Sequence, residues 1–240
     1  MRIKATISYD GSKFFGFQCQ KSTDKTVIST IYRALRKLGI DSKVIGSGRT
    51  DRGVHATGQV IHFDVPPYWE DLSKLHTMLN RHLHPHIHVR KLQKVSEDFH
   101  ARYSAKRRAY RYILTKKPFS VFDAAYLTYH DYKEEPIKEA IRLFEGKHDF
   151  RYFHKSGSDT QSTIRTIYKA RAYRYKELFI LYFEANGFLR SQVRMMVSFL
   201  LAISDDKLTR YHLQEQLQGK SRYLTTLAPP NGLYLCRVVY

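Results

Sequence analysis

The sequence predicts an α+β fold made of two pseudo-related α/β subdomains, each a mainly antiparallel sheet with helices packed on one face. Two observations predict it. Segments of strand composition alternate with segments of helical apolar periodicity, and this order begins again after Pro118. The length of 240 residues is enough for two small domains with cores of their own. We place the boundary near Tyr103, giving an N-terminal subdomain, 1–103, and a C-terminal subdomain, 104–240, although no residue-level repeat relates them.

In the N-terminal half, the alternating segment Ile3–Tyr9 predicts a strand that ends at Asp10-Gly11. The aromatic residues that follow, Phe14, Phe15 and Phe17, either pack in the core or line a base-binding surface. Apolar residues at helical spacing then predict a helix from Thr26 to Gly39. Further segments complete this half: strand composition in Ser42–Ile45 and Gln59–Val65, and a helix over Trp69–His82.

In the C-terminal half, the pattern predicts helices and strands in a similar order, with a terminal strand after Asn231-Gly232. The apolar stretch that begins at Asn186 predicts a buried helix capped by that asparagine. The predicted elements are helices over 136–145, 186–203 and 207–217, strands over 106–114, 164–173 and 178–185, and a loop over 156–160.

The chain is strongly basic, with 41 Lys and Arg against 22 Asp and Glu and a formal net charge of +19. A Lys-rich proteome would leave this charge as a solvated surface, whereas a functional origin points to a polyanion, since neutralised phosphates release counterions. A membrane partner is disfavoured because no apolar run of 18 residues and no signal-peptide pattern occur. We therefore expect a soluble, cytoplasmic protein.

Metal and disulfide chemistry is not predicted. Cys19 and Cys236 lie far apart and outside any Cys-x-x-Cys spacing, so we expect two reduced thiols. The run Arg81-His-Leu-His-Pro-His-Ile-His88 alternates histidines, but Pro85 interrupts it and no carboxylate or cysteine set accompanies it.

The stretch Gly46-Ser-Gly-Arg-Thr-Asp-Arg-Gly-Val-His55 carries the pattern most suggestive of catalysis. Its three glycines indicate a tight, specially shaped loop rather than a flexible tether. Asp51 lies at the centre of this loop, between Arg49 and Arg52. A carboxylate held by a stiff loop between two segments of strand composition is positioned in advance for reaction.

Basic and aromatic residues concentrate in Phe99-His-Ala-Arg-Tyr103 and in Lys106–Leu114. In a strand, Arg108, Tyr110 and Tyr112 share one face, which suits phosphates and stacked bases. Charges that protect an edge strand would have the same pattern. Arg190 and Arg194, one turn apart near the start of a mostly apolar helix, are costly there unless they meet an anion.

With these residues in view, the chain resembles the tRNA pseudouridine synthase I family. The resemblance covers essentially the whole chain, and its motifs occur in family order. They are Tyr9-Asp-Gly11 with Phe15-Gly-Phe-Gln18, Gly48-Arg-Thr-Asp-Arg-Gly-Val-His-Ala56 with Gly58-Gln-Val60, Asp98-Phe-His-Ala-Arg102 with Tyr110-Arg-Tyr112, Ala185-Asn186 with Phe188, Arg190 and Val193-Arg194, and Gly232-Leu-Tyr-Leu235.

The resemblance implies an isomerase that converts uridine to pseudouridine at positions 38 to 40 of the tRNA anticodon arm. It also implies a homodimer, an active-site cleft between the subdomains, and no cofactor or metal. Asp51 is then the essential carboxylate, and whether it attacks uracil C6 or ribose C1′, or deprotonates an intermediate, stays open. Because the target base is stacked, it must leave the stack before Asp51 reaches it.

The resemblance also implies roles for other residues. Arg49 fills the space that the base vacates and holds phosphate. Tyr110 stacks on the flipped uracil and assists proton removal at C5, and Leu233 lies against the other face of the base. Arg190 pairs with Asp51 and keeps it ionised. From the residues alone, Tyr110 reads as a core aromatic and Arg190 as a buried ion-pair partner. The further substrate-binding residues that we expect are Phe99, His100, Arg102, Tyr103 and Arg194.

Two departures from the family pattern stand out. Phe17 replaces a tryptophan found in many relatives, and Arg52 follows Asp51 where relatives often have Ala or Lys; an extra cation there affects RNA affinity rather than the chemistry.

Other functional classes remain to be weighed. A non-catalytic RNA-binding module would use the same charge but would have little reason to embed Asp51 among arginines. A metal-dependent nuclease would need several carboxylates, and only Asp64 lies close in sequence. A P-loop enzyme is excluded because the glycine loop lacks the Gly-Lys-Ser/Thr ending.

Overall fold

A computed structural model describes residues 1–117, 120–121, 123–157 and 161–240, which form two compact units. Unit 1 contains Met1–Lys106 and Tyr234–Tyr240, and unit 2 contains Arg107–Leu233. The boundary expected after Tyr103 lies three residues before the end of the first segment of unit 1. The C-terminal strand, which the sequence assigned to the second subdomain, belongs to unit 1 because it pairs with a strand of that unit.

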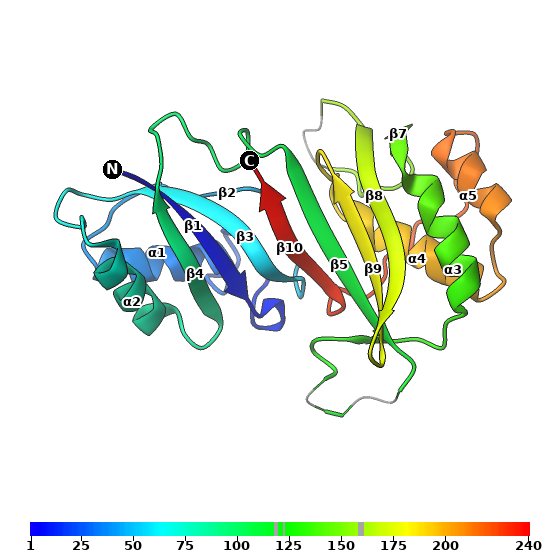
Figure 1. The fold of residues 1–240 in the computed structure, drawn as a ribbon, viewed down its shortest axis with the longest axis horizontal. Coiled ribbons are helices and arrows are strands. Elements are labelled where there is room, and N and C mark those ends of the chain that lie inside the picture. Colours follow the sequence, from blue (N-terminus) through cyan, green and yellow to red (C-terminus); the bar gives the residue numbers. More distant parts are fainter. Residues whose placement is uncertain (118–119, 122, 158–160) are drawn as a thin grey trace. The chain divides into compact units, whose positions relative to one another are not determined.

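The sheet of unit 1 has the strand order β4-β1-β3-β10, and β2 pairs with β3 (Figure 1). β1 runs antiparallel to both β3 and β4, whereas β10 runs parallel to β3. The expected strand over Ile3–Tyr9 is confirmed, but of the second expected strand, Ser42–Ile45, only Ile45 pairs, together with Gly46. The strands are β1 (Arg2–Tyr9), β2 (Ile45–Gly46), β3 (His55–Asp64), β4 (Ile87–Lys94) and β10 (Leu233–Val239).

One face of the unit 1 sheet is buried. Alternate residues of β1, from Ile3 to Tyr9, are buried and those between are half-buried, as expected for a strand with one covered face. Helix α1 (Val27–Lys37) begins after Thr26, whose side chain accepts from the Ser29 N–H, so the predicted helix is confirmed. Helix α2 (Leu72–Leu83) begins three residues after the predicted start at Trp69, because Asp71 caps it by accepting from Ser73 and Lys74 N–H.

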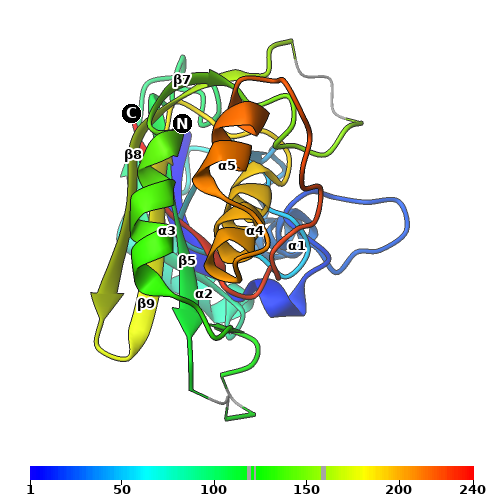
Figure 2. The ribbon, with the colours of Figure 1, turned by 90° about the vertical axis from the view of Figure 1, so that its right-hand side faces the viewer.

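Unit 2 has the strand order β5-β9-β8-β7, all antiparallel, with β6 parallel to β5. Helices α3, α4 and α5 lie together on one side of these strands (Figure 2). The predicted strands 106–114, 164–173 and 178–185 are confirmed, the first of them with its start at Arg107. The elements are β5 (Arg107–Thr115), β6 (Thr128–Tyr129), α3 (Glu134–Ile141), a 3-10 helix (Arg142–Phe144), β7 (Gly146–Asp149), β8 (Ile164–Tyr175), β9 (Leu178–Ala185), α4 (Gln192–Ser204) and α5 (Arg210–Leu217).

Two predicted helix starts in unit 2 are wrong. Asn186 does not cap α4; its Oδ1 accepts from the Thr166 N–H at 3.0 Å, and α4 begins after Ser191, which has a positive φ of 58°. Helix α5 begins at Arg210 instead of Lys207, because Thr209 and His212 form a capping box. Of the predicted loop 156–160, residues 158–160 lie outside the described part of the chain.

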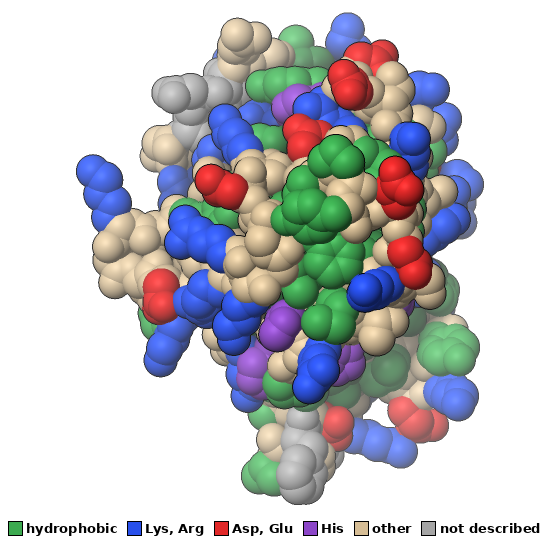
Figure 3. Space-filling model, turned by 90° about the vertical axis from the view of Figure 1, so that its left-hand side faces the viewer, with side chains coloured by type: hydrophobic (Ala, Val, Ile, Leu, Met, Phe, Trp, Pro, Cys, Tyr) green, Lys and Arg blue, Asp and Glu red, His purple; other side chains and the backbone are tan. Residues whose placement is uncertain are grey.

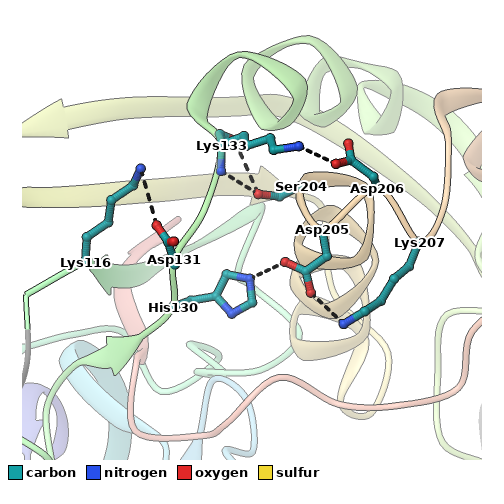
Figure 4. A network of polar contacts seen from close by, with 8 residues as sticks. All are labelled: Lys116, His130, Asp131, Lys133, Ser204, Asp205, Asp206 and Lys207. Atoms are coloured by element: carbon teal, nitrogen blue, oxygen red, sulfur yellow. Dashed lines mark hydrogen bonds and ion pairs between the residues drawn. The ribbon is translucent and has the colours of Figure 1, made fainter.

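A polar network joins the start of α3 to the end of α4 (Figure 4). His130 Nε2 contacts Asp205 Oδ1 at 2.8 Å, and Lys207 pairs with the other oxygen of Asp205 at 2.9 Å. Lys133 donates from its backbone N–H to Ser204 Oγ at 2.6 Å. These contacts fix the helical layer of unit 2. Both units thus have helices on mainly antiparallel sheets, and the predicted α+β class is confirmed.

Candidate active site

The Asp51 loop is anchored in unit 1 by the buried side chain of Gln59 on β3. Gln59 Oε1 accepts from Ser47 Oγ at 2.6 Å, and its Nε2 donates to the Gly48 carbonyl at 2.8 Å. The Ser47 N–H also donates to the Val60 carbonyl at 2.8 Å. Because Ser47 and Gln59 are 1% and 0% exposed, these bonds compete little with water and hold the first half of the loop rigidly.

The centre of the loop is fixed by Thr50, the residue directly before Asp51. The Thr50 and Tyr9 hydroxyls share a buried hydrogen bond of 2.8 Å, and the Thr50 carbonyl accepts from the Phe17 N–H at 3.1 Å. After Asp51 the chain turns through Gly53, whose φ of 79° lies in the region that favours glycine. The backbone on both sides of the carboxylate is therefore determined by neighbouring structure.

The second half of the loop ends at His55, which is 1% exposed. Its Nδ1 accepts from the Gly11 N–H at 3.0 Å, and its ring stacks on Tyr234 with centroids 4.7 Å apart. The turn containing Gly11, for its part, lies so close that a Cβ there would overlap the Val54 carbonyl. The sequence Tyr9-Asp-Gly11 thus supports the catalytic loop directly.

The loop exposes its charged residues while burying its anchors. Arg49 and Arg52 are exposed and Asp51 is half-buried, whereas Thr50 and Val54 are buried. A guanidinium on either side of a half-buried carboxylate makes an anionic group available within a positive environment. Such a carboxylate is able to act as a nucleophile or base on a substrate that is itself anionic.

The aromatic residues after β1 divide into two kinds. Phe14 and Phe17 are 7% and 4% exposed and pack against Tyr9, which supports the core interpretation for these two. Phe15 is exposed, and the Arg52 guanidinium lies over its ring at 4.2 Å. Arg52, a departure from the family pattern, is thus held by a cation–π contact beside the loop.

The segment Phe99–Tyr103 forms an aromatic and basic surface on unit 1. The His100 and Tyr103 rings stack with centroids 4.3 Å apart, and the Arg102 guanidinium lies 5.5 Å from the Tyr103 ring. Phe99 packs against Tyr240 at 4.9 Å, and Tyr103 is 75% exposed. The structure therefore brings the predicted residues of this segment together at the surface.

In unit 2, the two tyrosines predicted to share a basic face of β5 differ. Tyr110 is 8% exposed and meets Phe188 edge to face at 5.2 Å. Tyr112 is fully buried; its hydroxyl donates to the Pro229 carbonyl at 2.9 Å and shares a bond of 2.8 Å with Thr128. Burial raises the pKa of Tyr112. The prediction that Tyr112 belongs to a base-binding face is therefore wrong, because its ring is part of the core.

The two predicted arginines lie on either side of the start of α4. Arg190 precedes the helix, is exposed, and donates from Nη1 to the Ser156 carbonyl at 3.3 Å. Arg194, in the first turn, is half-buried and donates from Nε to the Ala228 carbonyl at 2.8 Å. Leu233, the first residue of β10, is 5% exposed. The sequence suggested that Arg190 is a buried residue of the helix. That prediction is wrong, because Arg190 is exposed and lies before the start of α4.

Several histidines group on the side of unit 1 that carries α2 and β4, and Figure 3 shows histidines below a hydrophobic area that has both basic and acidic side chains around it. His84 Nε2 and His88 Nδ1 are 2.9 Å apart. Among the residues that the structure describes, no three His, Cys, Asp or Glu side chains lie together as metal ligands would. The described helices likewise include none that is long and apolar enough to cross a membrane.

The sequence did not identify the residues that position Asp51. Ser47 and Thr50 belong to the loop, but their partners Gln59 and Tyr9 lie on strands and reach them only in the folded sheet. The one available signal is Gln59 itself, a polar residue at the start of the alternating run Gln59–Val65. Polar residues at such positions are buried only when their hydrogen bonds are made within the fold.

The geometry defines a protein that carries one half-buried carboxylate, between two exposed arginines, on a loop held by buried hydrogen bonds. The chain belongs to the tRNA pseudouridine synthase family, whose model matches residues 5–104 and 140–240. The Asp51 loop and the Phe99–Tyr103 segment both lie in the first matched region.

Curated relatives agree along the whole chain. A tRNA pseudouridine synthase A of Wolinella succinogenes is 45% identical over 99% of this chain and 94% of its own length. The enzyme of the same name from Helicobacter hepaticus is 45% identical over 99% and 98%, and that from Campylobacter jejuni is 41% identical over 100% of both chains. The solved archaeal box H/ACA Nop10–Cbf5 complex matches 83% of this chain with a TM-score of 0.34 and 12% identity, too low for any argument.

Proposed function

We propose that this protein isomerises uridine to pseudouridine in tRNA, at positions 38 to 40 of the anticodon arm. The observation that carries the proposal is the Asp51 loop, which Gln59 and Thr50 hold in place and in which the half-buried Asp51 is flanked in sequence by exposed arginines. Membership of the tRNA pseudouridine synthase family supports the reaction, and the net charge of +19 supports a polyanionic substrate.

The reaction requires that the glycosidic carbon-to-nitrogen bond breaks, that uracil turns, and that a bond from C5 to C1′ forms. We propose that Asp51 is the carboxylate that enables these steps, either by attacking C6 or C1′ or by deprotonating an intermediate. The proton lost from C5 returns to solvent, and the nitrogen released from C1′ takes one up, so the product is an isomer of the substrate. No redox partner or cofactor is needed for this balance.

The target base must leave its stack before Asp51 reaches it. We propose that Arg49, which is exposed two residues before Asp51, fills the vacated space and holds phosphate. Tyr110 stacks on the flipped uracil and assists proton removal at C5, with Leu233 against the other face. Arg190 balances the charge of Asp51. These roles rest on the resemblance to the family rather than on contacts among the four residues.

We further propose that the surface formed by Phe99, His100, Arg102 and Tyr103, together with Arg194, binds the RNA. The stacked His100 and Tyr103 rings and the exposure of Tyr103 support this role, because exposed rings beside a guanidinium suit unpaired bases. The working enzyme is proposed to be a cytoplasmic homodimer that acts on the anticodon arm of tRNA.

The test uses unmodified tRNA transcripts with uridine at positions 38, 39 and 40, labelled with tritium at uracil C5. The wild-type protein is expected to release tritium and to place pseudouridine at those positions. Binding of tRNA with no release from any of several transcripts would contradict the proposal and favour a non-catalytic RNA-binding module.

A matched pair of variants separates the two tyrosines of β5. Tyr110→Phe removes the hydroxyl proposed to assist at C5 and is expected to lower the rate of tritium release by about tenfold or more. Tyr112→Phe removes a hydroxyl that is buried and bonded within the core, so it is expected to lower stability by about 1–3 kcal/mol while the rate of the folded protein is retained. Equal rates for the two variants would remove Tyr110 from the mechanism.

A further inference from the structure

Unit 2 contains a cavity of about 220 Å³ that the catalytic proposal does not use. Its walls carry three cationic side chains, one imidazole and two hydroxyls: Arg151, Lys155, Arg222, His154, Ser156 and Thr225. Met195 of α4 lines it as well and is 1% exposed. No carboxylate is among the described residues that line the cavity. The lining is therefore suited to an anion.

The two walls of this cavity are held together by one buried side chain. Gln216 of α5, which is 0% exposed, donates to the Tyr152 carbonyl at 3.1 Å and accepts from the Tyr223 and Leu224 N–H groups at 2.8 and 3.1 Å. The bond to Tyr152 fixes the segment that carries Arg151 and His154. The bonds from Tyr223 and Leu224 fix the segment that carries Arg222. The backbone segments that carry the lining side chains are thus held in place by the fold.

The same wall is joined to the start of α4. The Lys155 N–H donates to the Arg190 carbonyl at 3.1 Å, and Arg190 Nη1 donates to the Ser156 carbonyl at 3.3 Å. The cavity therefore adjoins Arg190, a residue for which a catalytic role is proposed. An anion held here would be held next to that residue.

The electrostatic environment of the cavity is strongly positive. Arg151 is balanced by Asp149, whose Oδ2 accepts from Arg151 Nε at 2.7 Å. Behind this pair, Arg165 is half-buried, and within the described residues it donates to the Ser162 and Ile164 carbonyls and forms no ion pair. Burial and the Arg108 guanidinium lower the pKa of Arg165. Arg165 therefore adds a positive charge close to His154 that no ion pair among the described residues offsets.

His154 responds to the same field. Burial, followed by the charges of Arg222 and Arg165, lowers the pKa of His154, so the ring is neutral at physiological pH. Its Nδ1 is buried, and no hydrogen-bond partner for it exists among the described residues. The ring therefore adds no charge, and the positive potential comes from the lysine and the arginines.

We propose that this cavity binds a phosphate group of the tRNA backbone, on the same substrate that the proposed function assigns. The Arg222 guanidinium and the Lys155 ammonium, both exposed, supply charge, and the hydroxyls of Ser156 and Thr225 supply further donors. The phosphate fixes the register of the RNA on unit 2, next to Arg190, and carries no sequence information. This inference rests on the proposed function only in taking tRNA as the RNA that supplies the phosphate.

The test compares two double variants that remove the same charge. Arg222→Gln with Lys155→Gln removes the exposed cations of the cavity, and Arg142→Gln with Lys147→Gln removes two exposed cations elsewhere on unit 2. The dissociation constant for unmodified tRNA is measured for each protein between low and moderate KCl. The cavity variant is expected to bind about tenfold more weakly at low salt, with a salt slope smaller by about one. The control variant is expected to keep a slope close to that of the wild type.

A second measurement distinguishes a phosphate of the RNA backbone from a free phosphate ion. Inorganic phosphate is titrated into each protein, and its binding is followed by the His154 ring signals in NMR spectra. Equal losses of tRNA affinity in both double variants would overturn the proposal, because general charge would explain them. Phosphate binding by the wild type with an unchanged tRNA slope in the cavity variant would also overturn it and indicate a site for a free anion. A wild type that forms no pseudouridine yet binds tRNA with a cavity-dependent slope would refute the proposed function and support the phosphate contact.

Discussion

One of the contacts that attach the surface segment Phe99–Tyr103 to the rest of unit 1 is made by a buried histidine, and we predict that this contact makes stability sensitive to mild acid. His62 of β3 is 4% exposed, and its Nδ1 accepts from the Ala101 N–H at 3.0 Å. Burial, together with the charges of Arg2 and His100, lowers the pKa of His62 to about 4. Protonation of Nδ1 would remove the acceptor that the bond to Ala101 requires.

The sign and size follow from the difference in proton binding between the folded and unfolded states. An unfolded histidine has a pKa near 6.5, so between about pH 6.5 and 4 the unfolded chain binds a proton that the folded chain does not. The contribution of neutral His62 is therefore present above pH 6.5 and is lost as the pH falls. The loss is about 2 kcal/mol at pH 5 relative to pH 8, and about 3 kcal/mol in full.

The assay is urea unfolding of the wild type and of His62→Gln at several pH values from 8 to 5. Gln keeps an acceptor for the Ala101 N–H but does not titrate, so the variant is expected to lose about 2 kcal/mol less than the wild type over this range. His86→Gln, at an exposed histidine of the same unit, serves as the control and should follow the wild type. Parallel pH dependence in the wild type and His62→Gln would refute the reasoning.

Two further predictions concern packing around the Asp51 loop. A Cβ at Gly58 would overlap the Cys236 carbonyl, so Gly58→Ala should lower the free energy of unfolding by about 3 kcal/mol or more, measured by urea titration. Gly187→Ala, whose Cβ would lie 3.7 Å from Arg165, should be tolerated, and equal losses would contradict this account. Gln59→Leu leaves Ser47 and the Gly48 carbonyl without their buried partner, so it should lower stability by about 1–3 kcal/mol and slow tritium release; an unchanged rate would show that the loop is positioned without it.

The fold was predictable wherever local periodicity and burial agree. Helix α1 has both apolar spacing and a Thr26 cap, and β1 has strict alternation, so both were recovered from the sequence. The starts of α2 and α5 were not, because the capping residues Asp71 and Thr209 set them rather than the preceding apolar or basic residues. Asn186 has the composition of a cap but bonds to β8, a choice that only the tertiary fold determines.

The reactive residues of the candidate site were predictable from the sequence, whereas the residues that hold them in position were less so. Asp51 and its arginines are adjacent in the sequence, so the loop could be identified from glycine spacing and charge. The sequence could not show that Tyr112 is more deeply buried than Tyr110, because strand alternation places both on the same face of β5. Their burial depends on the segments that cover them, which for Tyr112 include Pro229. The phosphate cavity was missed since its two walls, around residues 151–156 and 222–225, meet only through Gln216.

The central claim is that Asp51 performs chemistry and does not merely shape an RNA-binding loop. It is tested most directly by comparing the wild type with Asp51→Asn for tRNA affinity and for single-turnover release of tritium from uracil C5. Asp51→Asn is expected to bind tRNA as tightly as the wild type or more tightly, because a negative charge near phosphate is removed, and to release no tritium. Release by Asp51→Asn at a rate near that of the wild type would contradict the claim.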